Sequence, residues 1–455
     1  MKSSFLLALT LLACSAAPLR AERPSFVILL ADDLGYGDLG CYGSPTILTP
    51  NLDRLAREGI RLTSFYAEPS CTPSRVALLT GRYPTRSGLY RVLGPDDTAG
   101  IPASEVTLAE GLKSQGYRTM AIGKWHLGSS DRKYFPTENG FDEYFGLLYS
   151  NDMTPPWVDT KRPLQLFRNV EPVEYPVNQD TLTERYTEEA VRFIRKSKGS
   201  PFFVYLAYTM VHVPLHASEK FRGRSRRGLY GDAVETIDWS AGRIADVLRE
   251  EGLERSTLLV FTSDNGPWLH MPPRMFSLFG EGWIKPWDAG SAGPLRGWKG
   301  TTYEGGVRVP CIARWPGRIP AGRISADIVS NMDLYTTFLK LAGAEVPAGR
   351  IVDGMDITPL LAGTGDSPRQ DFYYYNGKSL EAVREGKWKL RISPDHLGAA
   401  PEKRPPEPEL YDLDTDPSEM HDLSEDHPAI VSRLEGLLRK FSSEMVVGPA
   451  IDGGR

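Results

Sequence analysis

The sequence is poor in cysteine, has no excess of basic residues and lacks a membrane-length apolar run. Of its 455 residues only four are cysteine, at positions 14, 41, 71 and 311. That is too few for a disulfide scaffold, and no Cys/His spacing suggests a zinc site. Lys and Arg total 53 against 58 Asp and Glu, a formal net charge of −5, so nothing indicates nucleic-acid binding. No stretch reaches the roughly 18 apolar residues of a transmembrane helix.

Residues 1–21 have the three-part pattern of a secretory signal peptide. A short basic segment precedes the apolar residues 5–13, and small residues lead to Ala21. Residues 11–14 also approximate a lipoprotein cleavage box, which would leave Cys14 as a lipidated N-terminus; we prefer ordinary cleavage after Ala21. None of the eight asparagines lies in an N-x-Ser/Thr sequon. We therefore expect export, either to a bacterial periplasm or to the cell exterior.

Four apolar runs alternate with helical patterns and end in polar residues. The runs are residues 26–30, 119–122, 202–208 and 258–262, and the helical patterns lie at 108–113, 182–195 and 231–249. Continuous apolar runs are typical of central parallel strands covered on both faces, so we expect a doubly wound α/β sheet. Ligands of such sheets bind beyond the carboxyl ends of the strands. The polar residues at those ends are Asp32, Asp33, Lys124, His126, His212, Asp264 and Asn265.

The composition of these strand ends indicates hydrolytic chemistry on an anion. Carboxylates and an amide suit a hard cation such as calcium, which takes oxygen ligands. A lysine and two histidines beside them suit an anionic substrate and proton transfer. Any single cluster could be a solvated strand end, but four at one edge favour hydrolysis of a phosphate or sulfate ester.

A lone cysteine stands at the head of a predicted helix. Thr72 is the expected N-cap, Pro73 suits the first helical position and Gly81 is the expected stop. Cys71 would then lie where a helix N-terminus favours an anion, with Arg75 one turn further on. Two other interpretations stay open: a small buried cysteine without function, and a thiol nucleophile of low pKa, as in thiol phosphatases.

Three segments resemble signatures of one family, the type I sulfatases of the alkaline phosphatase superfamily. They are residues 71–81 (CTPSRVALLTG), 116–128 (GYRTMAIGKWHLG) and 297–310 (GWKGTTYEGGVRVP). In this family the cysteine of the first signature is oxidised to formylglycine after translation. The residues of these motifs are most similar to those in the branch of the family that contains arylsulfatase A and N-acetylgalactosamine-6-sulfatase. The resemblance runs from about Pro24 to the C-terminus.

The resemblance also implies a division of the chain. A large, mixed but mostly parallel sheet flanked by helices would occupy residues 22–365, after the signal peptide. A small α+β domain with a four-stranded antiparallel sheet would occupy residues 366–455. Its expected strands lie at 372–375, 380–384, 387–392 and 409–413, and its expected helix at 429–445.

The resemblance assigns a role to each polar residue. The calcium ligands would be Asp32, Asp33, Asp264, Asn265 and a formylglycine oxygen at position 71. Arg75 would orient the hydrated aldehyde, and Lys124, His212 and Lys299 would bind the sulfate oxygens. One hydroxyl of the hydrate would attack sulfur, and His212 or Lys299 would protonate the leaving alcohol. Loss of a proton from the second hydroxyl, to His126, would then expel sulfate. Ser150 and Asp152 would lie near the substrate.

The implied function is a calcium-dependent sulfatase that acts on sulfated small molecules or glycans, after a formylglycine-generating or maturase enzyme has converted Cys71. A phosphoester hydrolase, a sulfamidase and a non-catalytic glycan-binding relative are the alternatives on the same fold. Residues 149–177 and 268–295 are long, period-free segments, which we expect to form walls of the site, with His270 at the rim. Cys41 and Cys311 are expected to stay thiols, with pairing as the alternative.

Overall fold

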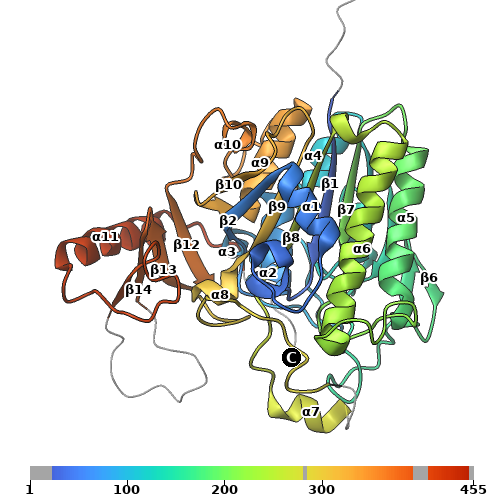
Figure 1. The fold of residues 1–455 in the computed structure, drawn as a ribbon, viewed down its shortest axis with the longest axis horizontal. Coiled ribbons are helices and arrows are strands. Elements are labelled where there is room, and N and C mark those ends of the chain that lie inside the picture. Colours follow the sequence, from blue (N-terminus) through green and yellow to red (C-terminus); the bar gives the residue numbers. More distant parts are fainter. Residues whose placement is uncertain (1–22, 280–283, 393–407, 450–455) are drawn as a thin grey trace, which may run out of the picture.

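The computed structural model describes residues 23–279, 284–392 and 408–449. The predicted signal peptide and Cys14 lie outside this part of the chain. In the described residues an 11-stranded sheet forms the main body, and a separate 4-stranded sheet lies beside it (Figure 1). None of the described helices has the length and apolar character needed to cross a bilayer.

The four predicted strands are neighbours at the centre of the large sheet. They are β1 (Ser25–Ala31), β3 (Arg118–Lys124), β7 (Phe202–Ala207) and β8 (Thr257–Ser263), in the spatial order β8-β1-β7-β3. All their pairings with one another are parallel. Every residue of β1 is buried, which explains its continuous apolar sequence. The predicted parallel core is confirmed.

Further strands make the sheet mixed. Beyond β3 lie β4 (Glu143–Leu147), which is parallel to it, and antiparallel β5 (Leu166–Arg168) and β6 (Glu171–Glu174). Beyond β8 lie antiparallel β9 (Arg308–Arg314) and then β2 (Ile60–Tyr66). Short strands β10 (Arg323–Ser325) and β11 (Val329–Ser330) both pair with β2.

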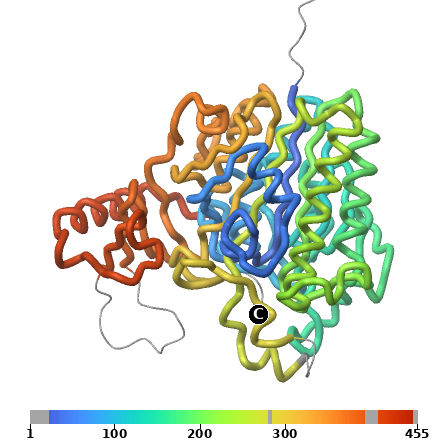
Figure 2. Tube along the Cα trace, in the orientation of Figure 1, coloured from blue at the N-terminus to red at the C-terminus, as the bar shows by residue number. Residues whose placement is uncertain are grey.

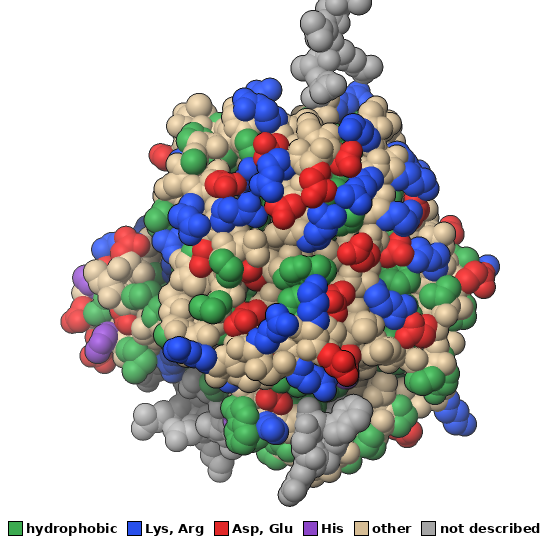
Figure 3. All heavy atoms as spheres, turned by 45° about the vertical axis from the view of Figure 1, so that its right-hand side comes forward, with side chains coloured by type: hydrophobic (Ala, Val, Ile, Leu, Met, Phe, Trp, Pro, Cys, Tyr) green, Lys and Arg blue, Asp and Glu red, His purple; other side chains and the backbone are tan. Residues whose placement is uncertain are grey.

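Helices pack on the sheet in two groups. One group is α1 (Pro50–Glu58), α5 (Leu182–Lys196) and α6 (Gly228–Glu250), and the other is α2 (Cys71–Thr80), α4 (Leu108–Lys113) and α9 (Asn331–Ala342). The ring of Phe26 on β1 stacks on Phe338 of α9, with centroids 4.3 Å apart. Acidic and basic side chains are interspersed on the face that carries α5 and α6, without a patch of one sign there (Figure 3). Short helices are α3 (Pro84–Ser87), α7 (Pro273–Phe279), α8 (Glu304–Val307) and α10 (Thr358–Ala362).

The C-terminal part forms the predicted antiparallel sheet with one helix. Its strands, in both chain and spatial order, are β12 (Asp371–Asn376), β13 (Ser379–Glu385), β14 (Trp388–Arg391) and β15 (Glu409–Asp412), and its helix is α11 (Pro428–Glu444). Figure 2 shows this part, in red, to one side of the main body and next to the yellow chain near residue 300. Its apolar cluster includes Tyr66 and Val307 of the main body. The two parts therefore share a buried contact.

Candidate active site

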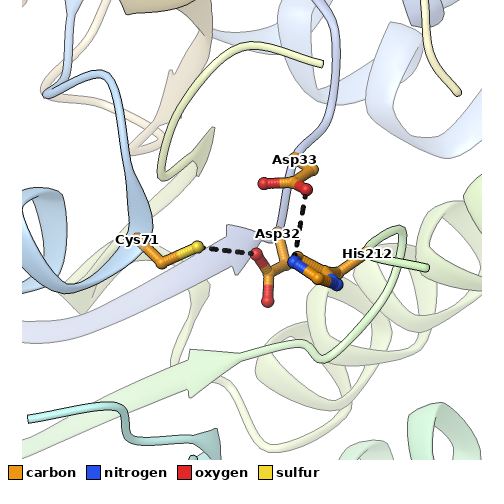
Figure 4. Close-up of side chains that lie close together, drawn as sticks. All are labelled: Asp32, Asp33, Cys71 and His212. Carbon is orange, nitrogen blue, oxygen red and sulfur yellow. Dashed lines mark hydrogen bonds and ion pairs between the residues drawn. The ribbon is translucent and has the colours of Figure 1, made fainter. Parts of the chain in front are cut away.

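The polar residues predicted at the strand ends meet at one edge of the large sheet. Ligand atoms of Asp32, Asp33, Cys71 and His212 all lie within 4.8 Å of one another, and all four residues are buried. Figure 4 shows the Cys71 sulfur directed at Asp32 and the His212 ring directed at Asp33. This is the expected convergence beyond the carboxyl ends of parallel strands.

Backbone hydrogen bonds between the strand ends bring the two aspartates into place. The amide of Asp32 donates to the carbonyl of Met210 (3.1 Å), and the amide of Asp264 donates to the carbonyl of Ala31 (3.1 Å). Asp33 has a positive φ of 60°, a conformation that non-glycine residues adopt mostly at turns and functional sites. Its amide donates to Asp264 Oδ1 (3.1 Å), which places both side chains in the same cluster.

Two buried cations and a partly buried one contact the carboxylates. Arg75 Nη2 lies 2.7 Å from Asp264 Oδ2 and 3.5 Å from Asp32 Oδ2. Lys124 Nζ lies 2.6 Å from Asp32 Oδ2, and Lys299 Nζ lies 2.8 Å from Asp33 Oδ1. Such pairing offsets the large cost of burying charge.

Ser150 lies beside one of these cations. Lys124 Nζ donates to Ser150 Oγ at 3.1 Å. The sequence placed Ser150 near the substrate, and the structure places its hydroxyl next to a cation of the cluster.

Burial and neighbouring charges shift the pKa values of this cluster. Burial raises the pKa of Asp33, but Lys299 and His212 outweigh it and hold that pKa below its usual value. Burial lowers the pKa of Lys124, but Asp32 outweighs it and keeps that pKa above its usual value. The carboxylate and the ammonium are therefore both charged at neutral pH.

His126 is neutral, unlike the carboxylates and cations around it. Burial and the charges of Lys124 and Arg75 lower its pKa well below the usual value. Its Nε2 lies 2.8 Å from the carbonyl oxygen of Leu93, which can only accept a hydrogen bond, so Nε2 carries the proton. The buried Nδ1 has no hydrogen-bond partner. His126 therefore presents a free basic nitrogen.

Helix α2 begins two residues earlier than predicted, so Pro73 is its third residue and not its first. It starts at Cys71 with Ser70 as N-cap, so the prediction of Thr72 as N-cap is wrong. The Thr72 hydroxyl instead donates to the carbonyl of His126 (2.9 Å) and accepts from the amide of Leu93 (3.2 Å). The predicted end is confirmed, because Gly81 has a φ of 69° and its amide donates to the carbonyl of Ala77.

Cys71 is 1% exposed, and its surroundings do not favour a thiolate. Burial raises the pKa of its thiol to about 12. The thiol nucleophile of low pKa, left open by the sequence, therefore does not fit this site. Cys71, Cys41 and Cys311 are all free of disulfide bonds in the described residues, which confirms the expectation of thiols at 41 and 311.

The donor set fits a hard cation. Asn265 Nδ2 donates to Asp33 Oδ1 at 2.7 Å and to the carbonyl of Gly266 at 2.9 Å. Its amide oxygen is buried and has no hydrogen-bond partner, although such atoms usually have one. An unpartnered oxygen beside Asp32, Asp33 and Asp264 is the kind of ligand that calcium takes.

Trp268 is a site residue that sequence reasoning missed. Its ring centroid lies 5.4 Å from that of His212, and Lys299 Nζ lies 4.6 Å from its centroid. The indole is partly exposed. Residue 268 was predicted only as the start of a wall; its position three residues after Asn265 was the available signal.

The two predicted walls contact each other. Arg274 of the second wall lies over the ring of Trp157 of the first, 5.5 Å from its centroid. His270 is exposed and stacks on Trp298, with centroids 5.4 Å apart. Asp152 Oδ1 is buried without a hydrogen-bond partner, 3.9 Å from His212 Nδ1. The long loops thus bring aromatic and acidic groups to the neighbourhood of His212.

Comparisons with known proteins match both parts of the chain. A family model described as Sulfatase matches residues 24–344, and one described as N-sulphoglucosamine sulphohydrolase, C-terminal, matches residues 297–444. The chain is 43% identical to N-acetylgalactosamine-6-sulfatase of Canis lupus familiaris, over 84% of this chain and 75% of that protein. It is 37% identical to arylsulfatase A of Bos taurus, over 96% and 92% of the two chains.

Solved structures give the same result. The PsFucS1 sulfatase from Pseudoalteromonas sp. superposes with a TM-score of 0.84 and 32% identity, over 95% of this chain and 92% of that one. The structure of Ps i-CgsB in complex with a neocarrahexaose superposes with a TM-score of 0.79 and 30% identity, over 92% and 93% of the two chains.

Proposed function

The chain belongs to the sulfatase family and is a sulfatase, and on that premise we propose that it hydrolyses sulfate esters of carbohydrates with a formylglycine made from Cys71 and a bound calcium ion. The observation that carries the proposal is the convergence of Lys124, His212 and Lys299 on the two aspartates beside Cys71. Two ammonium groups and an imidazole around one point fit a sulfate group and the charge that develops as it is transferred.

Calcium would be held by Asp32, Asp33, Asp264 and Asn265, with an oxygen of residue 71. When bound, it would offset the clustered carboxylates and stabilise negative charge on the substrate oxygens. The unpartnered amide oxygen of Asn265 supports this assignment.

The roles of the other residues follow from their hydrogen bonds. The hydrated aldehyde at residue 71 would supply the nucleophilic oxygen, and Arg75, fixed on Asp264, would orient it. His126 would accept a proton at its free Nδ1. His212 Nδ1 lies 2.6 Å from the carbonyl oxygen of Val213, so Nδ1 carries a proton. The imidazolium form then has Nε2–H to donate to the leaving alcohol.

A carbohydrate substrate is supported by the aromatic surroundings of the cations. The partly exposed indole of Trp268 lies against both Lys299 and His212, where it could stack on the apolar face of a sugar ring. Ser150 and Asp152 would contact hydroxyl groups of the sugar. The relatives named above include a sulfatase of N-acetylgalactosamine and a structure with a bound neocarrahexaose.

Maturation, location and domain limits are part of the same proposal. A formylglycine-generating or maturase enzyme would convert Cys71. Residues 1–21 would direct export to the periplasm or the cell exterior, with lipidation at Cys14 as the alternative. The catalytic domain would comprise residues 22–365 and the C-terminal domain residues 366–455.

A rate comparison on sulfated sugars, aryl sulfates, phosphate esters and sulfamates tests the substrate class. We expect sulfate esters to be turned over fastest; faster phosphate turnover would exclude the proposal. A sulfamidase is the second candidate, because residues 297–444 match the N-sulphoglucosamine sulphohydrolase model. Mass spectrometry of the tryptic peptide 62–75 from the native host tests maturation, and an unmodified thiol there would contradict the mechanism.

A further inference from the structure

The chain segment that follows Lys299 is held by side chains of the C-terminal sheet. Lys389 Nζ of β14 donates to the carbonyl of Thr302 at 2.8 Å. The Thr302 hydroxyl donates to Glu381 Oε2 of β13 at 2.6 Å. The amide of Glu304 donates to Glu419 Oε2 at 2.7 Å. Three side chains of the C-terminal domain, Lys389, Glu381 and Glu419, thus bind Thr302 and Glu304 of the main body.

The same contact contains buried charges. The side chains of Lys389, Glu304 and Glu419 are all 0% exposed. Lys389 Nζ lies 3.0 Å from Glu304 Oε1 and 2.7 Å from Glu419 Oε1. Burying such ionisable groups is costly even when they are paired. In some proteins buried ion pairs fix one geometry, and the segment beside this cluster carries Lys299.

An aromatic side chain of the segment is also fixed. The Tyr303 ring has the guanidinium carbon of Arg391 at 3.7 Å from its centroid and that of Arg296 at 4.1 Å. Arg391 belongs to β14, two residues after Lys389. Cation–π contacts of buried groups add to the stability of such an arrangement.

The other side of the segment contacts the active site. The amide of Lys299 donates to the carbonyl of Pro267 (3.0 Å), and the amide of Gly300 donates to the carbonyl of Pro69 (2.7 Å). Pro267 follows Asn265 by two residues, and Pro69 precedes Cys71 by two. The amide of Gly266 donates to the carbonyl of Gly306. The Lys299 segment therefore lies between the site and the C-terminal sheet.

We propose that Lys389, Glu381 and Glu419 form a clamp that positions Lys299 for turnover. The clamp residues do not touch the reacting groups; they fix the backbone of residues 300–304, from which the long Lys299 side chain reaches Asp33. A lysine ammonium on a four-carbon stem has many rotamers, so its placement depends on a fixed backbone. Misplacement by about 1 Å can cost roughly 10²-fold in rate. The inference rests on the proposed function, in which Lys299 binds the sulfate.

Two variants of different severity test the clamp. Thr302→Val removes one hydroxyl and keeps the size of the side chain, and Lys389→Met removes the buried cation. The matched control is Lys387→Met, which removes a lysine that pairs with Asp412 in the same sheet (2.6 Å) and is 45% exposed. Each protein is assayed on an aryl sulfate at equal conversion of residue 71, measured by mass spectrometry. We expect kcat/KM to fall about 5- to 20-fold for Thr302→Val and further for Lys389→Met, with no change for the control.

A double-mutant cycle separates positioning from a general loss of folding. In a Lys299→Ala background the clamp variants should lower kcat/KM by less than about 2-fold, because the group they position is gone. Equal losses in both backgrounds would overturn the clamp and leave the proposed function intact, as would a Thr302→Val enzyme with normal kcat/KM. Near-normal activity of Lys299→Ala alone would instead overturn the proposed role of Lys299.

Discussion

The protein contains two buried charge clusters that differ in how their atoms are partnered. At the strand ends, charged groups from six separate segments leave the Asn265 amide oxygen and His126 Nδ1 without hydrogen-bond partners. In the clamp, Lys389 pairs with Glu304 and Glu419, and two of the side chains also bind the backbone of one loop. Unpartnered buried polar atoms are expected where a ligand completes the site. Charged groups that pair with each other and with backbone are expected where they hold another segment of the same chain in place.

The largest expected effect is on stability, from the clamp. Lys389→Met leaves Glu419 buried without its cation and removes one of the cations that pair with Glu304, which keeps Arg308 at 3.4 Å. Breaking a buried pair in this way typically costs about 3–5 kcal/mol in the free energy of unfolding. Urea denaturation of the variant and of Lys387→Met measures this difference. A loss below about 1 kcal/mol would remove the distinction between the two clusters.

The next effect is on turnover, from the strand-end cluster. Lys299→Ala and His212→Ala each remove a group that we place on the sulfate or the leaving alcohol. We expect kcat to fall by about 10²-fold or more, the usual range for acid–base groups. Steady-state assays on an aryl sulfate measure it, with Lys285→Ala, which changes an exposed lysine of the wall 268–295, as control. Rates within a few-fold of the parent enzyme would show that the strand-end cluster, like the clamp, has a structural role and no catalytic one.

Calcium should stabilise the strand-end cluster and leave the clamp unaffected. At free calcium about 100 times its Kd, the free energy of unfolding should rise by about 2.7 kcal/mol. Thermal unfolding with EGTA and with added calcium measures the difference, and turnover lost in EGTA should return with calcium. Asn265→Ala should reduce the calcium-dependent shift. Equal melting temperatures in both conditions, with metal-free protein confirmed by metal analysis, would contradict the assignment.

A buried carboxyl outside both clusters gives the smallest effect. Burial and, to a lesser degree, Asp353 raise the pKa of Glu68 to about 8, and its Oε1 has no hydrogen-bond partner. A raised pKa means that the folded protein loses stability as the pH rises from the usual carboxyl range to about 8. Glu68→Gln should therefore raise the free energy of unfolding at pH 8 and change it little near pH 4. Gains of equal size at both pH values would show that charge is not the cause.

Much of the fold and the site follows from local sequence. The all-apolar runs predicted the central strands, because strands buried on both faces cannot alternate polar and apolar residues. The residues after those runs predicted the site, because parallel strands end at one edge. The N-cap at Thr72 was wrong, since its hydroxyl bonds to Leu93 and His126 and not to the helix.

Long-range partners could not be found in this way. Lys389 and Glu419 are more than 80 residues from the Lys299 loop, and both lie in segments whose local pattern predicts only short strands and turns. Their partners include backbone atoms of residues 302 and 304, and such contacts cannot be inferred from the spacing of side chains in the sequence. Trp268 was missed for a related reason, since only the folded loop brings its ring to His212.

The central place of β1 has a consequence for the growing polypeptide. In the described structure β1 hydrogen-bonds only to β7 and β8, which begin at residues 202 and 257. For the first two hundred residues of synthesis a strand that is apolar except for Ser25 has neither of its native neighbours. Unpaired apolar strands are prone to associate with other chains. Early binding by chaperones would protect this strand until its neighbours have been made.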